Sequence, residues 1–69
     1  MDEDTLCAAV RERVHATRDE ERGIDVILVG VSDVALIGRV IGRLRGEFDL
    51  CDMQMVSWGP TRVIRVSWW

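Results

Sequence analysis

The side chains that could do chemistry are few and lie far apart along the chain. Cys7 and Cys51 are the two thiols, His15 is the single imidazole, and Asp49 and Asp52 are carboxylates beside a predicted strand start. A nucleophile needs a base within hydrogen-bond reach. The one thiol and imidazole at helical spacing are Cys7 and His15, and the sequence offers His15 no other obvious serine or cysteine partner. The two carboxylates are typical solvated loop residues. We therefore expect a protein that is not an enzyme.

A metal or cofactor site also lacks its components. One histidine and two cysteines without a CxxC spacing cannot supply a zinc ligand set. The segment GVSDVALIG at 30–38 has neither the glycine spacing nor the lysine of a phosphate-binding loop. We expect no cofactor and no metal, and we interpret both cysteines as small buried apolar side chains in a reducing compartment.

The composition is that of one small acidic domain. The 69 residues are 48% hydrophobic and 30% charged, with a net charge of −3. A negative chain has little attraction for nucleic-acid phosphates, and no apolar run approaches the roughly 20 residues that cross a bilayer. The first residues, MDEDTL, are acidic where a secretory signal is basic and then apolar. The expected location is the cytoplasm, without direct contact to nucleic acid or membrane.

Five elements follow from the hydrophobic periodicity and the turn signals. The nearly unbroken run IDVILVGV, the longest run of β-branched and aliphatic residues, predicts a strand. Apolar residues at helical spacing mark two helices, and Gly59-Pro60 marks a hairpin turn. The predicted elements are a helix at 2–22, a strand at 24–31, a helix at 33–46, and strands at 51–58 and 61–69.

Glycines recur every fourth residue along one flank of the second helix, at Gly38, Gly42 and Gly46. An interior glycine costs about 1 kcal/mol relative to alanine, so a compensating contact is expected. We expect close approach of the first helix at Gly38 and Gly42, with approach of a partner protein or no role as alternatives. Gly46 is the predicted C-cap. On another side of this helix, Arg43 is expected to pair with Glu47.

The order of elements predicts an α+β fold with a three-stranded sheet. A right-handed crossover leaves room for the last strand between the first two, antiparallel to both, so the sheet order is first, third, second. If Trp58 and Thr61 flank the hairpin loop, Met55 lies opposite Ile64. Both helices then cover one face. The sheet residues predicted for this face are Ile24, Val26, Leu28, Met53, Met55, Ile64, Val66 and Trp68.

The uncovered face is the expected functional surface. A contiguous apolar area with polar groups at its rim, containing tryptophan and arginine, is typical of association sites. The alternative is a half-solvated sheet whose exposed valines have no role. The residues predicted to bind a partner are Ile27, Val29, Gln54, Val56, Trp58, Val63, Arg65 and Trp69.

From Ile24 onward the chain resembles an ACT domain, the ferredoxin-like module of amino-acid-sensing regulatory subunits. LIGRVIGRL at 36–44 resembles the family's LARVxGxL helix, RGEFDL at 45–50 its RGYNI element with one residue inserted, and TRVIRVSW at 61–68 its third strand. The family's last helix and strand are missing, and Val34-Ala35 replaces its Pro-Gly. The resemblance implies an amino-acid ligand at the Ser32-Asp33 turn, with Asp49 nearby from a neighbouring subunit.

These expectations favour a small regulatory protein-protein interaction module. It would act through its open sheet face or an exposed strand edge, as a homodimer or within a larger complex. Its size and acidity also fit an inhibitor of a larger complex, for example an anti-defence protein carried by a phage. The alternative function is an ACT-like domain that senses an amino acid.

Overall fold

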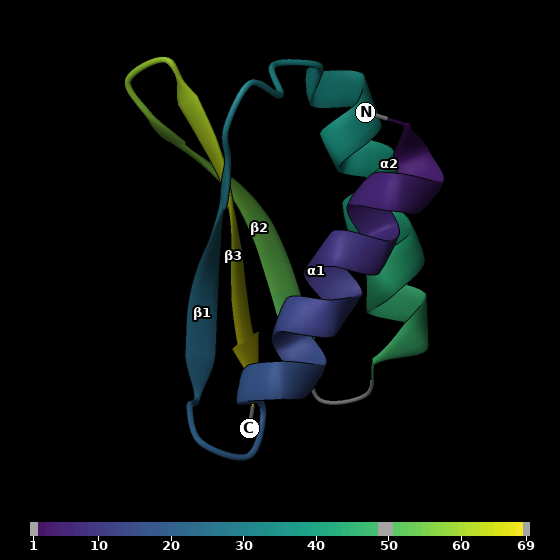
Figure 1. The fold of residues 1–69 in the computed structure, drawn as a ribbon, viewed down its shortest axis with the longest axis vertical. Coiled ribbons are helices and arrows are strands. Elements are labelled where there is room, and N and C mark those ends of the chain that lie inside the picture. The colour runs from purple at the N-terminus through teal and green to yellow at the C-terminus, as the bar shows by residue number, and fades with distance from the viewer. Residues whose placement is uncertain (1, 49–50, 69) are drawn as a thin grey trace.

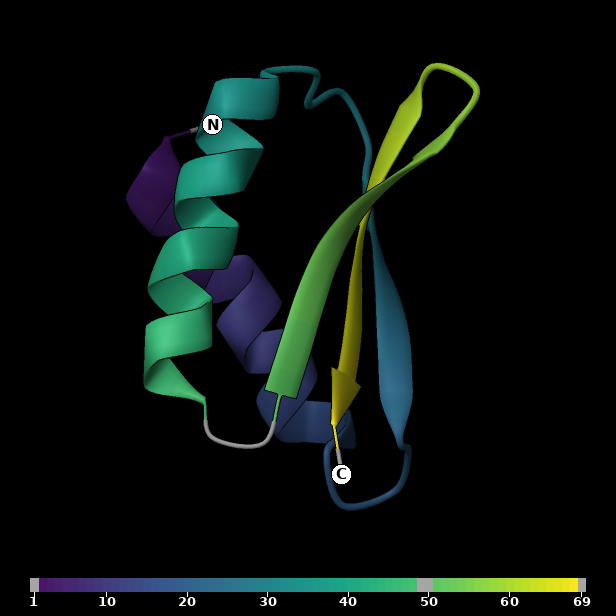
Figure 2. The same ribbon diagram turned by 180° about the vertical axis from the view of Figure 1, so that it is seen from behind.

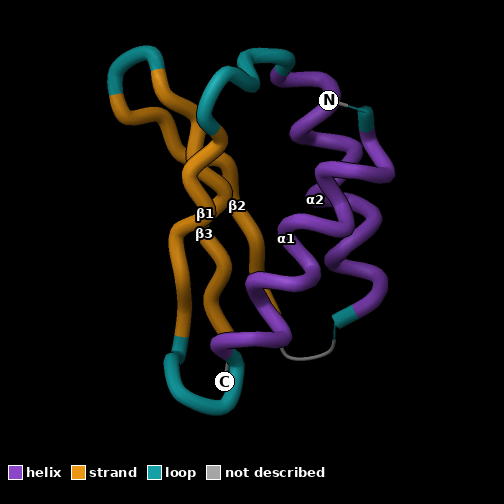
Figure 3. The backbone as a smooth tube through the Cα atoms, viewed as in Figure 1, coloured by secondary structure: helices purple, strands orange, loops and turns teal. Residues whose placement is uncertain are grey.

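The fold has two layers, a three-stranded sheet and a pair of helices that lie on the same side of it (Figures 1 and 3). The structure is a computed structural model and describes residues 2–48 and 51–68. The elements are α1 (Glu3–Thr17), β1 (Gly23–Leu28), α2 (Val34–Glu47), β2 (Cys51–Trp58) and β3 (Thr61–Trp68). The sheet order β1-β3-β2, antiparallel throughout, confirms the predicted α+β fold.

The hairpin of β2 and β3 has the predicted register. Trp58 lies opposite Thr61, and Met55 lies opposite Ile64. Gly59 in the turn between them has φ +61°, a conformation that glycine adopts without steric cost. On the other side of β3, Ile64 lies opposite Val26 of β1. The middle strand therefore has partners on both sides, whereas β1 and β2 each have one open edge.

The first helix is shorter than the predicted range 2–22. It begins as expected, because the Asp2 carboxylate accepts a hydrogen bond from the Thr5 N–H at 2.8 Å. It ends at Thr17, and the acidic run at 19–21 follows directly. Negative charge is unfavourable beside the carbonyl end of a helix, so the chain turns there instead of continuing to Gly23.

The first strand ends at Leu28, earlier than in the predicted strand at 24–31. Gly30 has φ +76°, and the Val31 N–H turns back to the Leu28 carbonyl at 3.5 Å. A left-handed glycine of this kind interrupts an extended chain. Val29 therefore lies in a loop and not in the sheet.

The second helix runs one residue beyond the predicted range 33–46, and the expectation that Gly46 forms its C-cap is wrong. The chain leaves the helix at Phe48, which has an extended backbone and whose N–H still donates to the Leu44 carbonyl at 3.1 Å. At the start, Asp33 is the N-cap, and its carboxylate accepts from the Leu36 N–H at 3.1 Å.

The glycine flank of α2 faces open space, so the expected contact with α1 is wrong. A Cβ built on Gly38 or Gly42 would meet no atom within 4 Å outside the local helix backbone. A different side of α2 faces α1, where ion pairs join the two helices. Glu47 pairs with Arg11 of α1 at 2.8 Å, and not with Arg43. Arg43 instead contacts acidic residues at the start of α1.

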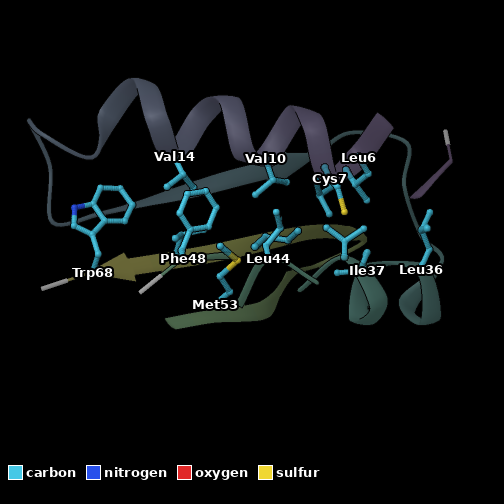
Figure 4. Close-up of a cluster of buried hydrophobic side chains, with 14 residues drawn as sticks. Leu6, Cys7, Val10, Val14, Leu36, Ile37, Leu44, Phe48, Met53 and Trp68 are labelled. Atoms are coloured by element: carbon cyan, nitrogen blue, oxygen red, sulfur yellow. The ribbon is translucent and has the colours of Figure 1, made fainter. Parts of the chain in front are cut away.

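The core fills the space between the helix layer and the sheet (Figure 4). It is apolar throughout the described residues, and Trp68 closes one end by donating its indole Nε1–H to the Arg18 carbonyl at 3.1 Å. Leu36 and Phe48, at the two ends of α2, are also buried in it. The buried side chains include Leu6, Cys7, Val10, Val14, Leu28, Ile37, Val40, Leu44, Met53, Ile64 and Val66.

Met55 departs from its predicted burial. It occupies the covered side by register, opposite Ile64, but its side chain is 37% exposed. Figure 2 shows that the hairpin end of β2 and β3 bends away from α2, so the helices cover less of the sheet toward the hairpin. The alternation predicted the side of the sheet correctly, whereas burial also depends on how far the helices reach.

Candidate protein-interaction surface

The side of the sheet opposite the helices, called the open face below, is formed by alternate residues of the three strands. Because successive side chains of a strand point to opposite faces, the register determines which residues share this side. Figure 1 shows both helices on the opposite side. The residues of the open face are Asp25, Ile27, Asp52, Gln54, Val56, Trp58, Thr61, Val63, Arg65 and Ser67.

Large apolar side chains on the open face are accessible except at its centre. Ile27 is 53% exposed and Trp58 is 45% exposed, while Val56 is half-buried. Val63 has no exposed surface, although it was predicted to bind a partner. It lies on the middle strand directly between Ile27 and Val56, and cross-strand neighbours at this spacing shield a small side chain. Val63 is therefore part of the support of the open face and not of its contact surface.

The exposed apolar groups continue around the end of the sheet where β1 leaves it. Val29 is 85% exposed in the loop after β1, and Val34, at the first position of α2, is 47% exposed. The loop lies beside the hairpin turn, since Ile27, Val29 and Pro60 line one hollow there. Val34 was not among the predicted partner-binding residues, because those all lie on predicted strands and helical periodicity does not place Val34 on the core side. Trp69, a predicted partner residue, lies outside the described residues.

The polar part of the open face is an ion pair across neighbouring strands. Arg65 donates from Nε to Asp25 Oδ1 at 2.9 Å and from Nη2 to Oδ2 at 3.3 Å. The guanidinium lowers the pKa of Asp25, and the carboxylate raises the pKa of Arg65. The two residues lie directly opposite each other in the register, so β1 and β3 hold the pair in a bidentate geometry. The predicted residue Arg65 thus presents a compensated charge.

A second polar cluster lies where the open face meets the outer edge of β2. The Gln54 amide donates to Asp52 Oδ2 at 3.0 Å, and this bond, together with Arg45, lowers the pKa of Asp52. Arg45 of α2 also donates to the Met53 carbonyl at 2.7 Å. The predicted residue Gln54 is exposed but already bonded within the chain, and Arg45 occupies a backbone acceptor of the strand.

The groups that could do covalent chemistry are not arranged for it. Cys7 is almost fully buried, and burial raises the pKa of its thiol. The same effect raises the pKa of the half-buried Cys51, so neither favours the reactive thiolate. His15 is exposed and lies edge-on to the Phe48 ring, with 5.3 Å between the two ring centroids. Among the described residues, no three metal-ligating side chains gather.

The turn implicated by the family resemblance forms a shallow hollow with little free polar chemistry. It is lined by residues 29–33 and Leu36, with a volume of about 300 Å³. Ser32 is exposed, but the Asp33 carboxylate is engaged as the N-cap of α2. Asp49 lies outside the described residues. The structure therefore shows Ser32 as the free polar side chain of this candidate site.

Two results from the whole chain complete this description. Within residues 2–48 and 51–68, no helix is both long and apolar enough to span a membrane. No family model, no curated protein and no solved structure matches the chain. Inferences about function therefore depend on the geometry of the chain itself.

Proposed function

We propose that the protein is a non-enzymatic interaction module that binds another protein chain through the open face and the sheet edge beside it. One observation carries the proposal: both helices lie on one side of the sheet, and the other side exposes Ile27 and Trp58 around a fully buried Val63. Exposed large apolar groups on a rigid sheet, with an ion pair beside them, are the composition of an association site.

The gain from covering this face is substantial for so small a chain. Full burial of a large aliphatic side chain contributes about 1.5–3 kcal/mol, and Ile27 and Trp58 each retain about half of their surface. A domain of this size buries only about 60% of the surface that its unfolded chain exposes. A partner on the open face therefore stabilises the fold as well as the complex.

The outer surface of the helix layer is a weaker candidate for the same role. Several of its charged residues are already paired with one another, as Arg11 is with Glu47 and Arg39 is with Glu3 at 2.8 Å. Charges that are satisfied within the chain and exposed to water gain little from a partner. The Asp25–Arg65 pair, by contrast, lies among apolar groups and would orient a partner on the open face.

The decisive experiment places a charge on the open face. Val56 is half-buried and points outward, so Val56→Asp introduces an unpaired carboxylate there while leaving the core intact. Ala35→Asp makes the same change on the exposed side of α2 and is the matched control. Light scattering after size exclusion measures the mass of each variant, alone and in extract of the cell that encodes the chain.

We expect Val56→Asp to weaken association at least tenfold and Ala35→Asp to leave it unchanged, with both variants folded by circular dichroism. A wild-type chain of monomer mass in both conditions, or equal masses for Val56→Asp and wild type in the extract, would contradict the proposal. Val63→Asp is unsuitable as a probe because that side chain is completely buried.

A second candidate is an ACT-like domain that senses an amino acid, supported by the hollow at residues 29–33 beside the start of α2. A ligand that binds the folded state alone raises the melting temperature in proportion to RT ln(1 + [L]/Kd). A panel of the standard amino acids at millimolar concentration tests it. A shift abolished by Ser32→Ala supports the candidate, and no shift with any amino acid rejects it.

A further inference from the structure

We infer that the partner is a second copy of this chain, which pairs with the first along the open edge of β1 and extends the two sheets into one. This inference rests on the proposed function, since it names the partner for the sheet edge beside the open face.

The open edge of β2 is protected against strand addition. The Arg45 guanidinium donates to the Met53 carbonyl at 2.7 Å and contacts Asp52 at 2.9 Å. An arginine on an edge carbonyl removes an acceptor that an added strand needs and places a charge where that strand would lie. The edge of β2 is therefore an unfavourable docking site.

The open edge of β1 presents a regular set of backbone groups. The Trp68 N–H donates to the Arg22 carbonyl at 2.9 Å, which marks these two residues as a hydrogen-bonded pair. In an antiparallel ladder such pairs alternate with residues whose N–H and C=O point away. Following the register from Arg22, the groups of Gly23, Asp25 and Ile27 point away from β3. The same alternation directs the Met53 carbonyl outward on β2, where Arg45 is found.

Strand β1 lacks the devices that protect edges. Its sequence, GIDVIL, contains no proline, lysine or arginine, and its one charge, on Asp25, is compensated by Arg65. Ile27 adds an exposed β-branched side chain on the open face. An apolar edge of six residues with unprotected N–H and C=O groups is a template for another strand.

Charge and burial select one register for two antiparallel copies of β1. Centring the pair on Asp25 would set like charges opposite each other, which is destabilising. Centring it on Val26 sets Asp25 opposite Ile27 of the other copy, so that their outward backbone groups exchange hydrogen bonds. On the covered side, Ile24 then lies opposite Leu28. Centring it on Ile27 leaves little overlap, because the strand ends at Leu28.

The covered side of β1 indicates a second copy in preference to a foreign peptide. Ile24 and Val26 are core residues that remain only partly buried at this edge. A second copy brings the same apolar residues and its own helices to the same side of the joined sheet. A lone extended peptide would bring the backbone groups but no helix layer.

Paired proline substitutions test the edge. Proline is tolerated where the N–H points to solvent, and by the alternation both Ile27 and Met55 meet this condition, on β1 and β2 respectively. By light scattering on the purified chain alone, we expect the wild type to have twice the 7.9 kDa monomer mass. Met55→Pro should remain a dimer, and Ile27→Pro should be a monomer or dimerise at least tenfold more weakly.

Cross-linking tests the register. Val26 would face its own copy at a non-hydrogen-bonded position, where side chains are closest and the Cβ spacing suits a disulfide. In a Cys51→Ala background, Val26→Cys should form a covalent dimer under mild oxidation. Ile24→Cys, on the same side but opposite Leu28, is the matched control and should cross-link much less.

The outcomes separate this inference from the proposed function. A purified wild type that stays monomeric, while extract contains a complex sensitive to Val56→Asp, overturns self-pairing and keeps the interaction module. A dimer that survives Ile27→Pro but not Met55→Pro overturns the choice of edge. Cross-linking at Ile24 in place of Val26 overturns the register.

Discussion

Val63 shows that a face without a covering layer can still contain a fully buried residue. It has no exposed surface because it lies on the middle strand between Ile27 and Val56. Its role is to support the neighbours that a partner would touch. Changes at Val63 therefore act on stability before they act on association.

At this position we predict that Val63→Asp lowers the free energy of unfolding by about 3 kcal/mol or more, because a buried unpaired charge is among the costliest substitutions. Val29→Asp is the control, since that side chain is 85% exposed in a loop and should change stability by about 0.5 kcal/mol at most. Urea denaturation followed by circular dichroism measures both. Equal stability of the two variants would show that Val63 is accessible after all.

The glycines of α2 allow the opposite kind of change. Gly38 and Gly42 have open space where a Cβ would be, so alanine at either position should stabilise the chain by about 1 kcal/mol. Gly23→Ala is the control and should destabilise, because its Cβ would lie 2.7 Å from the Val66 carbonyl oxygen. Thermal melts measure all three. A lower melting temperature for Gly42→Ala would indicate that another chain packs on this flank.

At the scale of elements, ion pairs join the two helices across the surface of their layer. Arg11 pairs with Glu47, while Glu3 of α1 accepts from Arg39 and Arg43 of α2. These partners lower the pKa values of both glutamates, with the hydrogen bond to arginine as the largest cause in each case. The helix layer is thus fastened by pairs that depend on ionised carboxylates.

This dependence predicts an acid-sensitive helix pair. A lowered folded-state pKa contributes stability that is present above the ordinary glutamate value of 4.5 and is lost as the pH falls from there through the folded value. The melting temperature should therefore decrease once the pH is lowered beyond about 4.5. Glu47→Gln should lower the melting temperature at neutral pH and make its decrease in acid smaller. Melts from pH 7 to pH 3 test this, and 1 M salt should reduce the effect. An identical pH profile for Glu47→Gln would contradict it.

The contact of Arg45 with the open edge of β2 leads to a further prediction for the sheet. Arg45→Ala frees the Met53 carbonyl and opens a second edge, so the chain should form species larger than a dimer or precipitate at high concentration. Arg39→Ala removes an equally charged but more exposed arginine of the same helix, with its side chain at 58%, and should not. Light scattering over a concentration series compares them. Unchanged mass for Arg45→Ala would mean that Arg45 does not protect the edge.

Much of this arrangement follows from sequence patterns, and the exceptions have physical causes. The hairpin turn and the alternation along the strands predicted the hairpin register, because a slip by one residue would reverse every side chain. The right-handed crossover predicted the sheet order. The helix ends were less well predicted. The acidic run at 19–21 ends the first helix through its charge, and the burial of Phe48 in the core ends the second through tertiary packing. Burial at Val63 and Met55 depends on neighbours from other strands and on the reach of the helices, which periodicity does not contain.

At the scale of the whole molecule, the chain has too little helix to cover its sheet. Two helices lie over one face, and the other face and the β1 edge are left to solvent or to a partner (Figure 2). The exposed apolar groups gather toward that side and toward the end where Val29 and the hairpin lie. We therefore expect the chain to associate with a partner.

The most direct test of this account maps where the chain changes when it associates. Amide chemical shifts of isotope-labelled protein, recorded from dilute to concentrated solution, report the contact surface residue by residue. We predict concentration-dependent shifts that cluster along β1, at Asp25 and Ile27, with the amides of Gly38 and Gly42 unchanged. Shifts clustered on the exposed side of α2, or an absence of shifts at every concentration and with every added partner, would contradict it.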